Sequence, residues 1–202
     1  MFVVIEGGDA AGKTTLINGL KQKIQLGLGD LLAKNTVFLK SPTAPFDNVW
    51  KDIIKTADSL TRFYLFRSIA QNDIAKTKQL MKGGQHVILE RCFLSTEAFN
   101  WALDEQNNIA DPAMRSENHI NYGGLTKPDL RFFLDVSDET REQRLQQKQK
   151  RSDWENYKFQ TLFNTKLRAI AKRDNWIMIN TDDMNINQVL DFVSSQIVQY
   201  QR

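Results

Sequence analysis

Residues 2–15, FVVIEGGDAAGKTT, decide the fold of this 202-residue chain. The apolar run 2–5 predicts a buried strand, and Gly7, Gly12, Lys13 and Thr14 match the phosphate-loop pattern G-x-x-x-x-G-K-S/T. In such a loop, backbone N–H groups cradle phosphate oxygens, the lysine contacts the β- and γ-phosphates, and the hydroxyl ligates magnesium. A helix from 14 to about 25 would point its positive end at the same anion. A chance match in an ordinary glycine turn is the alternative, but the flanking strand and helix favour a phosphate loop.

Composition indicates one domain, spanning residues 1–202, because no Pro-, Ser- or Gly-rich stretch divides the chain. The formal charge of +3 is too small to imply a nucleic-acid polymer or an anionic membrane as partner. No apolar stretch approaches the roughly 20 residues that span a bilayer, and no charged leader precedes the first strand. The single cysteine, Cys92, excludes an internal disulfide and suits a reducing compartment. We therefore expect a cytoplasmic protein with no membrane partner.

Short apolar strands alternate with longer helical stretches along the whole chain, which predicts an α/β fold with a parallel sheet. The expected strands are 2–5, 37–39, 86–89, 130–134 and 176–179. The expected helices are 14–25, 59–82, 95–105, 138–148, 153–172 and 186–200. Segment 107–124 is the best loop candidate, although Pro112 could open a short helix there. Ligands of such sheets bind beyond the carboxyl ends of the strands.

Two cations follow predicted strands at this ligand-binding edge. Lys40 comes directly after strand 37–39, and Arg91 comes one residue after Glu90, which ends the next strand. Together with Lys13 they would hold more than one phosphate group, which indicates a second anionic substrate rather than nucleotide hydrolysis alone. The alternative is that both are solvated surface charges.

A basic cluster, residues 143–153, follows the fourth strand and one helix and contains Arg144, Lys148 and Arg151. A solvated helix end is the plainer interpretation. In a phosphoryl transferase, however, a mobile arginine can stabilise the charge of the transition state. The loop has Ala10 and Ala11 where an arginine could have supplied that charge. A lid over about 144–153 would then supply it.

With these motifs in order, the chain resembles the thymidylate kinases, nucleoside-monophosphate kinases of the phosphate-loop superfamily. The resemblance runs from end to end. It is carried by the loop at 5–15, by 38–42 (Phe-x-Arg-x-Pro with lysine for arginine), by 63–67 (Phe-Tyr-x-x-Arg), by 90–100 and by 128–136.

The resemblance implies a three-layer fold whose five-stranded parallel sheet has the order 2-3-1-4-5, and a homodimer. ATP and Mg²⁺ would be the cofactors. By the resemblance, ATP is held by Gly7, Gly8, Ala10, Ala11, Gly12, Lys13, Thr14, Thr15 and Arg144. The acceptor monophosphate is held by Asp9, Phe38, Lys40, Phe66, Arg67, Arg91, Thr96, Phe99 and Asn100. The resemblance also implies that Lys13, Arg91, Arg151 and Glu90 are catalytic and that Thr14 and Glu90 bind magnesium.

Several departures from the family pattern concern the base rather than the reaction. Glu90 replaces an aspartate, Phe99 a tyrosine and Asn100 a glutamine, and Trp101 stands where small residues are usual. We expect ATP- and Mg-dependent phosphorylation of a nucleoside monophosphate, dTMP in the first place.

Two other functions are alternatives. A deoxynucleoside kinase must deprotonate a 5′-hydroxyl and places a carboxylate after the second strand, where this chain has none until Asp47; Glu90 as the base stays open. A non-catalytic nucleotide-binding module would commonly have lost Lys13, Thr14 or Arg91. Trp50, Trp154 and Trp176 are interpreted as core or interface aromatics and Cys92 as an inert thiol.

Overall fold

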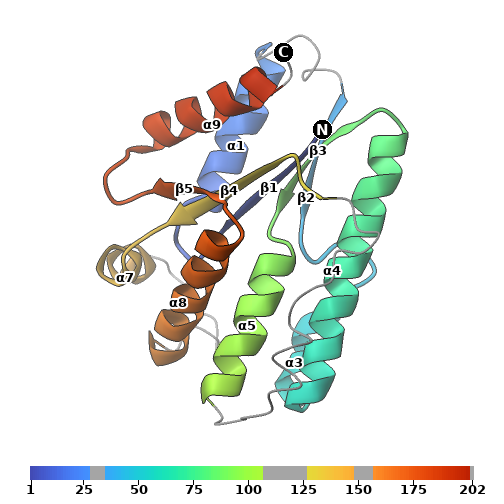
Figure 1. The fold of residues 1–202 in the computed structure, drawn as a ribbon, viewed down its shortest axis with the longest axis vertical. Coiled ribbons are helices and arrows are strands. Elements are labelled where there is room, and N and C mark those ends of the chain that lie inside the picture. The colour runs from blue at the N-terminus through green and yellow to red at the C-terminus, as the bar shows by residue number, and fades with distance from the viewer. Residues whose placement is uncertain (28–34, 107–126, 148–156, 201–202) are drawn as a thin grey trace.

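The computed structural model describes residues 1–27, 35–106, 127–147 and 157–200. Their five parallel strands form one sheet in the order β2-β3-β1-β4-β5, which confirms the predicted topology (Figure 1). The elements are β1 (Phe2–Gly7), α1 (Lys13–Gln25), β2 (Thr36–Lys40), α3 (Trp50–Thr56), α4 (Ser59–Lys82), β3 (His86–Glu90), α5 (Phe93–Gln106), β4 (Leu130–Asp135), α7 (Asp138–Gln146), α8 (Tyr157–Arg173), β5 (Ile177–Asn180) and α9 (Ile186–Tyr200).

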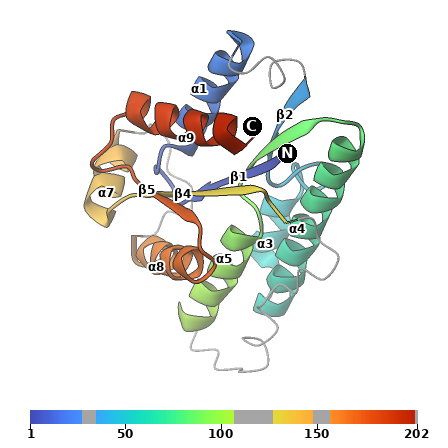
Figure 2. The same cartoon turned by 45° about the horizontal axis from the view of Figure 1, so that its top comes forward.

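The strands are apolar on both faces because helices cover both faces. Val4, Leu89 and Phe133 pack against α4, α5 and α8, whereas their neighbours Val3, Ile88 and Phe132 pack against α1 and α9. Figure 2 shows these two groups of helices on opposite sides of the sheet. Alternation of side chains along a strand thus builds two cores from each central strand.

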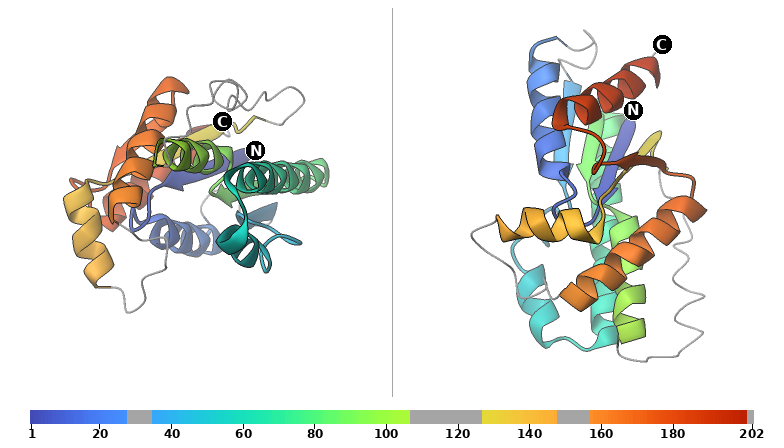
Figure 3. Two further views of the ribbon diagram at one scale, coloured as in Figure 1. Left: turned by 90° about the horizontal axis from the view of Figure 1, so that it is seen from below. Right: turned by 90° about the vertical axis from the view of Figure 1, so that its left-hand side faces the viewer.

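The central strand positions the site. Every residue of β1 is buried, and β1 pairs with β3 on one side and β4 on the other. Ile5 lies beside Glu90 and Gly7 beside Leu134, so the loop after β1 begins next to the ends of both neighbours. Figure 3 shows α7, which follows β4, running across this carboxyl end of the sheet.

Helix boundaries follow local caps where the sequence supplies them. The Asp58 carboxylate accepts a 2.7 Å hydrogen bond from the Thr61 N–H at the start of α4, and the Ser137 hydroxyl accepts one of 3.1 Å from the Thr140 N–H at the start of α7.

The short helix α3 is not among the predicted elements, because seven residues carry too little periodicity to be recognised. Predicted loop 107–124 lies wholly outside the described residues. Of the helices described, none is long and apolar enough to cross a bilayer.

Candidate functional site

The turn from β1 to α1 has the backbone of a phosphate loop. Gly7 has a φ of 148°, and a Cβ there would come within 2.5 Å of the Leu134 carbonyl oxygen. Gly12 has a φ of 95°, a conformation that residues with a side chain rarely adopt. The first residue of α1 is Lys13, so the N-terminal end of the helix faces the loop. Both glycines of the motif are thus required, one by space and one by conformation.

The Lys13 side chain is anchored to the carbonyls of its own loop. The side chain is buried, and its Nζ donates hydrogen bonds to the carbonyl oxygens of Gly7 at 2.9 Å and Gly8 at 2.6 Å. Burial, followed by the nearby positive charge of Arg91, lowers the pKa of Lys13 to about 7. A bound polyphosphate would supply the missing negative charge and restore the ammonium form.

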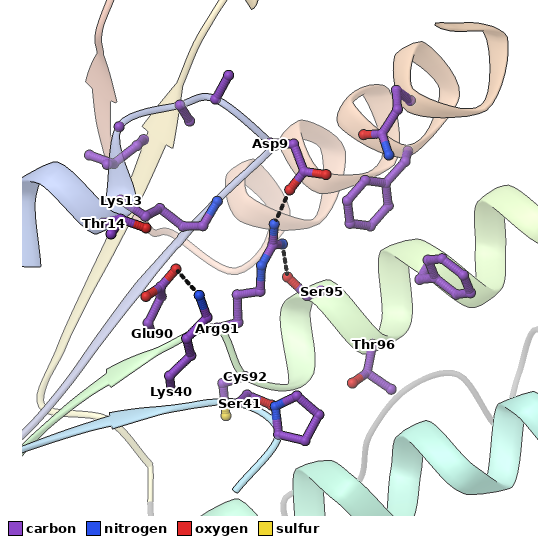
Figure 4. A pocket seen from close by; sticks show the side chains of 18 of the residues that line it. Asp9, Lys13, Thr14, Lys40, Ser41, Glu90, Arg91, Cys92, Ser95 and Thr96 are labelled. Carbon is purple, nitrogen blue, oxygen red and sulfur yellow. Dashed lines mark hydrogen bonds and ion pairs between the residues drawn. The ribbon is translucent and has the colours of Figure 1, made fainter. Parts of the chain in front are cut away.

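Arg91 is fixed at the end of β3 in an unusual backbone conformation. Its φ is 64°, and its N–H donates to the Ile5 carbonyl oxygen at 3.0 Å. Its guanidinium pairs with the Asp9 carboxylate and donates to the Ser95 hydroxyl at 3.1 Å (Figure 4). Figure 4 shows Lys13 and Arg91 approaching the pocket from the loop and from β3 respectively. The structure therefore brings these two predicted cations together.

Lys40 and Glu90 end the adjacent strands β2 and β3 and lie side by side. Their ion pair spans 3.7 Å, with the Lys40 side chain largely exposed and Glu90 buried. An exposed ammonium beside a buried carboxylate is free to turn toward an anion in the cavity. Both residues line that cavity.

Glu6 supports this arrangement from beneath and was not among the predicted site residues. This buried carboxylate accepts hydrogen bonds from the N–H groups of Cys92 at 2.7 Å and Ser95 at 3.1 Å and from the Ser95 hydroxyl at 2.6 Å. The same hydroxyl accepts from Arg91, so Glu6 holds the Arg91 loop through Ser95. A carboxylate inside an otherwise apolar strand was the available signal.

One cavity of about 1290 Å³ connects the phosphate loop to the ends of β2 and β3 and to a chamber between α3, α4, α5 and α8. Aromatic rings line the chamber, with centroids 6.1 Å apart for Trp50 and Phe66 and 4.8 Å apart for Phe66 and Phe99. Phe159 continues the cluster at 5.2 Å from Phe99. Trp50 was predicted as a core or interface aromatic, but it lines this cavity. Thr96, also buried, adds a polar group from α5.

Three predicted base contacts lie away from the described lining of the cavity. Phe38 points to the opposite face of β2, where it packs against the core under α1. The Arg67 guanidinium lies 5.2 Å from the ring centroid of Phe63, and Ile69 takes the place on α4 that faces the cavity. Asn100 is buried on α5, next in sequence to the cavity-lining Phe99, but is not itself among the lining residues. None of the three lines the described cavity, so their assignment to the base stays a prediction.

On the donor side, Arg144 from α7 reaches the loop. It donates to the Ala10 carbonyl oxygen at 3.2 Å and to the Thr181 carbonyl oxygen at 2.8 Å. The cavity is lined by residues 9–15 of the loop. Gly7 and Gly8 contribute the carbonyl oxygens that accept hydrogen bonds from Lys13. Arg151 and Lys148 lie outside the described residues, as does most of the predicted lid at 144–153.

In the described part of the chain, no cluster of three or more His, Cys, Asp or Glu side chains could hold a metal ion. A cation here would need oxygens from a bound nucleotide in addition to Thr14 and Glu90.

Cys92 is buried beneath Arg91, and this burial raises the pKa of its thiol well above the usual range.

Comparison with known proteins gives consistent results. The family model described as thymidylate kinase matches residues 5–193. A thymidylate kinase from Prochlorococcus marinus is 28% identical over 98% of this chain and 90% of its own length. A probable thymidylate kinase from Thermoplasma acidophilum is 28% identical over 72% of this chain and 70% of its own length.

Solved structures share the fold. The thymidylate kinase of Candida albicans has a TM-score of 0.73 at 21% identity, covering 99% of this chain and 92% of that one. The deoxyadenosine kinase of M. mycoides with bound dATP has a TM-score of 0.70 at 14% identity, covering 98% of this chain and 99% of that one.

The lowered pKa of Lys13 predicts that ATP binding takes up a proton. Free protein with a Lys13 pKa of about 7 is mostly neutral there at pH 8, whereas the phosphate-bound lysine is charged. Affinity for ATP should therefore fall above pH 7, by up to about tenfold per pH unit. Calorimetry in buffers of different ionisation enthalpy measures the uptake, and Lys13→Met should abolish it.

Stability of the free protein should follow the opposite trend. Unfolded Lys13 has its ordinary pKa of 10.5, so between about pH 7 and 10.5 the unfolded state binds more protons. This group therefore stabilises the fold as pH rises through that window, relative to Lys13→Met. Equal pH slopes in the two proteins would contradict the buried, neutral lysine.

Loss of the Glu6 charge should damage acceptor binding through Arg91. We expect Glu6→Gln to lower the free energy of unfolding by about 1–3 kcal/mol and to raise the KM for the acceptor nucleotide several-fold. Glu97→Gln is the matched control, because Glu97 is equally buried on α5 but pairs with Arg173. It should lose stability and leave that KM unchanged; a rise of KM in both variants would refute the positioning role.

Proposed function

This chain belongs to the thymidylate kinase family, and on that premise we propose that it transfers the γ-phosphoryl group of ATP to a nucleoside monophosphate, dTMP in the first place. An oxygen of the acceptor phosphate would bond to the γ-phosphorus while the bond to the β–γ bridging oxygen breaks, giving ADP and a nucleoside diphosphate. The observation that carries the proposal is the single cavity that joins the phosphate loop to the cations Arg91 and Lys40.

The donor half fits a magnesium–triphosphate. Loop N–H groups would hold the phosphates, and the buried Lys13, which lacks a full counter-charge, would gain one from them. Arg144 would lie over the nucleotide, since it already contacts the loop at Ala10. Magnesium, held by Thr14 and phosphate oxygens with Glu90 nearby, would neutralise charge that develops in the transition state. Arg151 remains our candidate for a further catalytic cation of the lid.

The acceptor half fits a monophosphate. A phosphate near Arg91 would compete with Asp9 for the guanidinium, and the greater negative charge of a phosphate dianion favours the phosphate. Asp9, released, would face the sugar, and Lys40 would assist at the phosphate. The base would stack in the aromatic chamber near Phe66 and Phe99, with Thr96 as its polar contact. In this proposal Phe38, Arg67 and Asn100 have no direct contact with the base.

Phosphorylation of a nucleoside 5′-hydroxyl is the second candidate. It is favoured by two carboxylates that line the cavity, Asp47 and Glu90, either of which could act as a base. Against it, the Glu90 carboxylate already forms an ion pair with Lys40. A phosphate dianion needs cations and no base, and the ends of β2 and β3 supply cations.

We also infer the domain organisation, location and assembly of the enzyme. The chain would form one kinase domain with a lid over 144–153. It would act in the cytoplasm as a homodimer and without a nucleic-acid polymer. Exposed apolar side chains on and beside α3 and α4 support a dimer, since Val49, Ile53, Leu60 and Tyr64 are each at least 37% exposed. Sedimentation equilibrium would test this assembly.

A panel of acceptors tests the reaction. With ATP and magnesium, we expect dTMP to be phosphorylated and thymidine not, because the site supplies cations for a phosphate that is already charged. Other deoxynucleoside monophosphates, assayed alongside, measure the selectivity for the base. Phosphorylation of thymidine alone would overturn the proposal in favour of the second candidate.

Substitution of Arg91 tests the division between the two halves. Arg91→Met should raise the KM for dTMP by about tenfold to a hundredfold through loss of charge-assisted hydrogen bonds, and should leave the KM for ATP nearly unchanged. Lys13→Met, in contrast, should abolish turnover. Equal losses for both substrates in Arg91→Met would argue against an acceptor site at the end of β3.

A further inference from the structure

Arg141 is a buried cation with few partners among the described residues. It lies on α7 with no exposed surface, one helical turn before Arg144, yet its Nε, Nη1 and Nη2 have no hydrogen-bond partner in the described part of the chain. Its ion pair with Asp138 is long, at 3.4 Å. Its Cζ lies 5.7 Å from the ring centroid of Tyr157. A buried guanidinium with so few partners is costly, because water no longer solvates it.

The contacts of Asp138 connect Arg141 to the phosphate loop. The Asp138 carboxylate oxygen near Arg141 also accepts a 3.4 Å hydrogen bond from the Asn164 amide of α8. The Asn164 carbonyl oxygen has no hydrogen-bond partner among the described residues and lies against Gly8, where an added Cβ would come within 2.1 Å of it. The buried Arg141 is thus two side chains away from the loop that would hold the donor phosphates.

The position of α7 makes a direct contact with a nucleotide feasible. Arg144 on the same helix already reaches the Ala10 carbonyl, and residues three apart on a helix have Cβ atoms about 5–6 Å apart. To turn toward the loop, Arg141 gives up one long ion pair and a ring contact. Phosphate oxygens offer short, bidentate hydrogen bonds in return.

We propose that Arg141 is a further cation of the phosphoryl-transfer site, held beside Asp138 in the free protein and drawn to the γ-phosphate of the donor on binding. The resemblance to thymidylate kinases pointed to Arg144 and Arg151 and not to this position. A cation that has few hydrogen bonds in the free state gains more from the phosphate than one that is already satisfied. The proposal rests on the donor half of the proposed function and does not depend on the identity of the acceptor.

Arg141→Met tests the proposal, because methionine keeps the apolar stem and removes the charge. We expect the ligand-free variant to melt at the same or a higher temperature than the wild type, since a poorly paired buried charge is removed. Affinity for the magnesium complex of β,γ-imido-ATP should fall by about tenfold, while affinity for ADP changes less than twofold. Turnover should fall with it.

Arg168→Met is the matched control. Arg168, on α8, is like Arg141 not among the residues that line the cavity, but its guanidinium is well paired, because it donates to the Asp135 carboxylate at 2.6 Å and to the Val136 carbonyl. This variant should melt at a lower temperature and bind both nucleotides like the wild type.

Two results would overturn the inference: unchanged affinity of Arg141→Met for β,γ-imido-ATP, or a lower melting temperature with equal loss of both nucleotides. If the wild type fails to phosphorylate dTMP, the proposed acceptor is wrong, but the nucleotide affinities still decide the role of Arg141.

Discussion

The register between β1 and β3 is the constraint on which the cavity depends. Ile5 lies beside Glu90, and the Ile5 carbonyl receives the N–H of Arg91 at 3.0 Å. The same strand then carries Glu6, which holds the next turn, and Gly7, where the phosphate loop begins. A slip by one residue would turn every side chain of the strand to the other face of the sheet and separate the loop from Arg91.

Positive charge is gathered at this edge with incomplete compensation. Within the described residues, Lys13 has hydrogen bonds to carbonyls only, Arg91 shares one carboxylate, and Arg141 has a single ion pair, at 3.4 Å. Each of these groups is more stable when an anion is present, so the free protein is organised around charges that its ligand supplies. Stability and substrate binding are therefore coupled, and polyphosphate should stabilise this fold well beyond the contacts that it adds.

The sheet and the loop could be predicted from the sequence because their signals are local. A complete glycine-lysine-threonine motif after an apolar strand specifies the backbone of 7–15. The alternation of strands and helices predicted a parallel sheet, and the resemblance to the family implied its strand order. The faces of the elements were harder. Phe38 and Leu39 are both apolar, so the sequence does not tell which of them faces the ligand side of β2. Likewise Arg67 resembles a base-reading arginine, but the packing of α4 turns Ile69 to the cavity. Trp50, Glu6 and Arg141 were missed because their roles arise from contacts with elements distant in sequence.

The placement of Cys92 also shapes how the protein meets reactive molecules. Its thiol adjoins the substrate cavity, but burial keeps it protonated, and only the thiolate is a strong nucleophile. Electrophiles and mild oxidants that enter the cavity would therefore meet a protonated, weakly nucleophilic thiol at Cys92. Thiol-directed reagents should therefore react slowly with Cys92, although it lines the cavity.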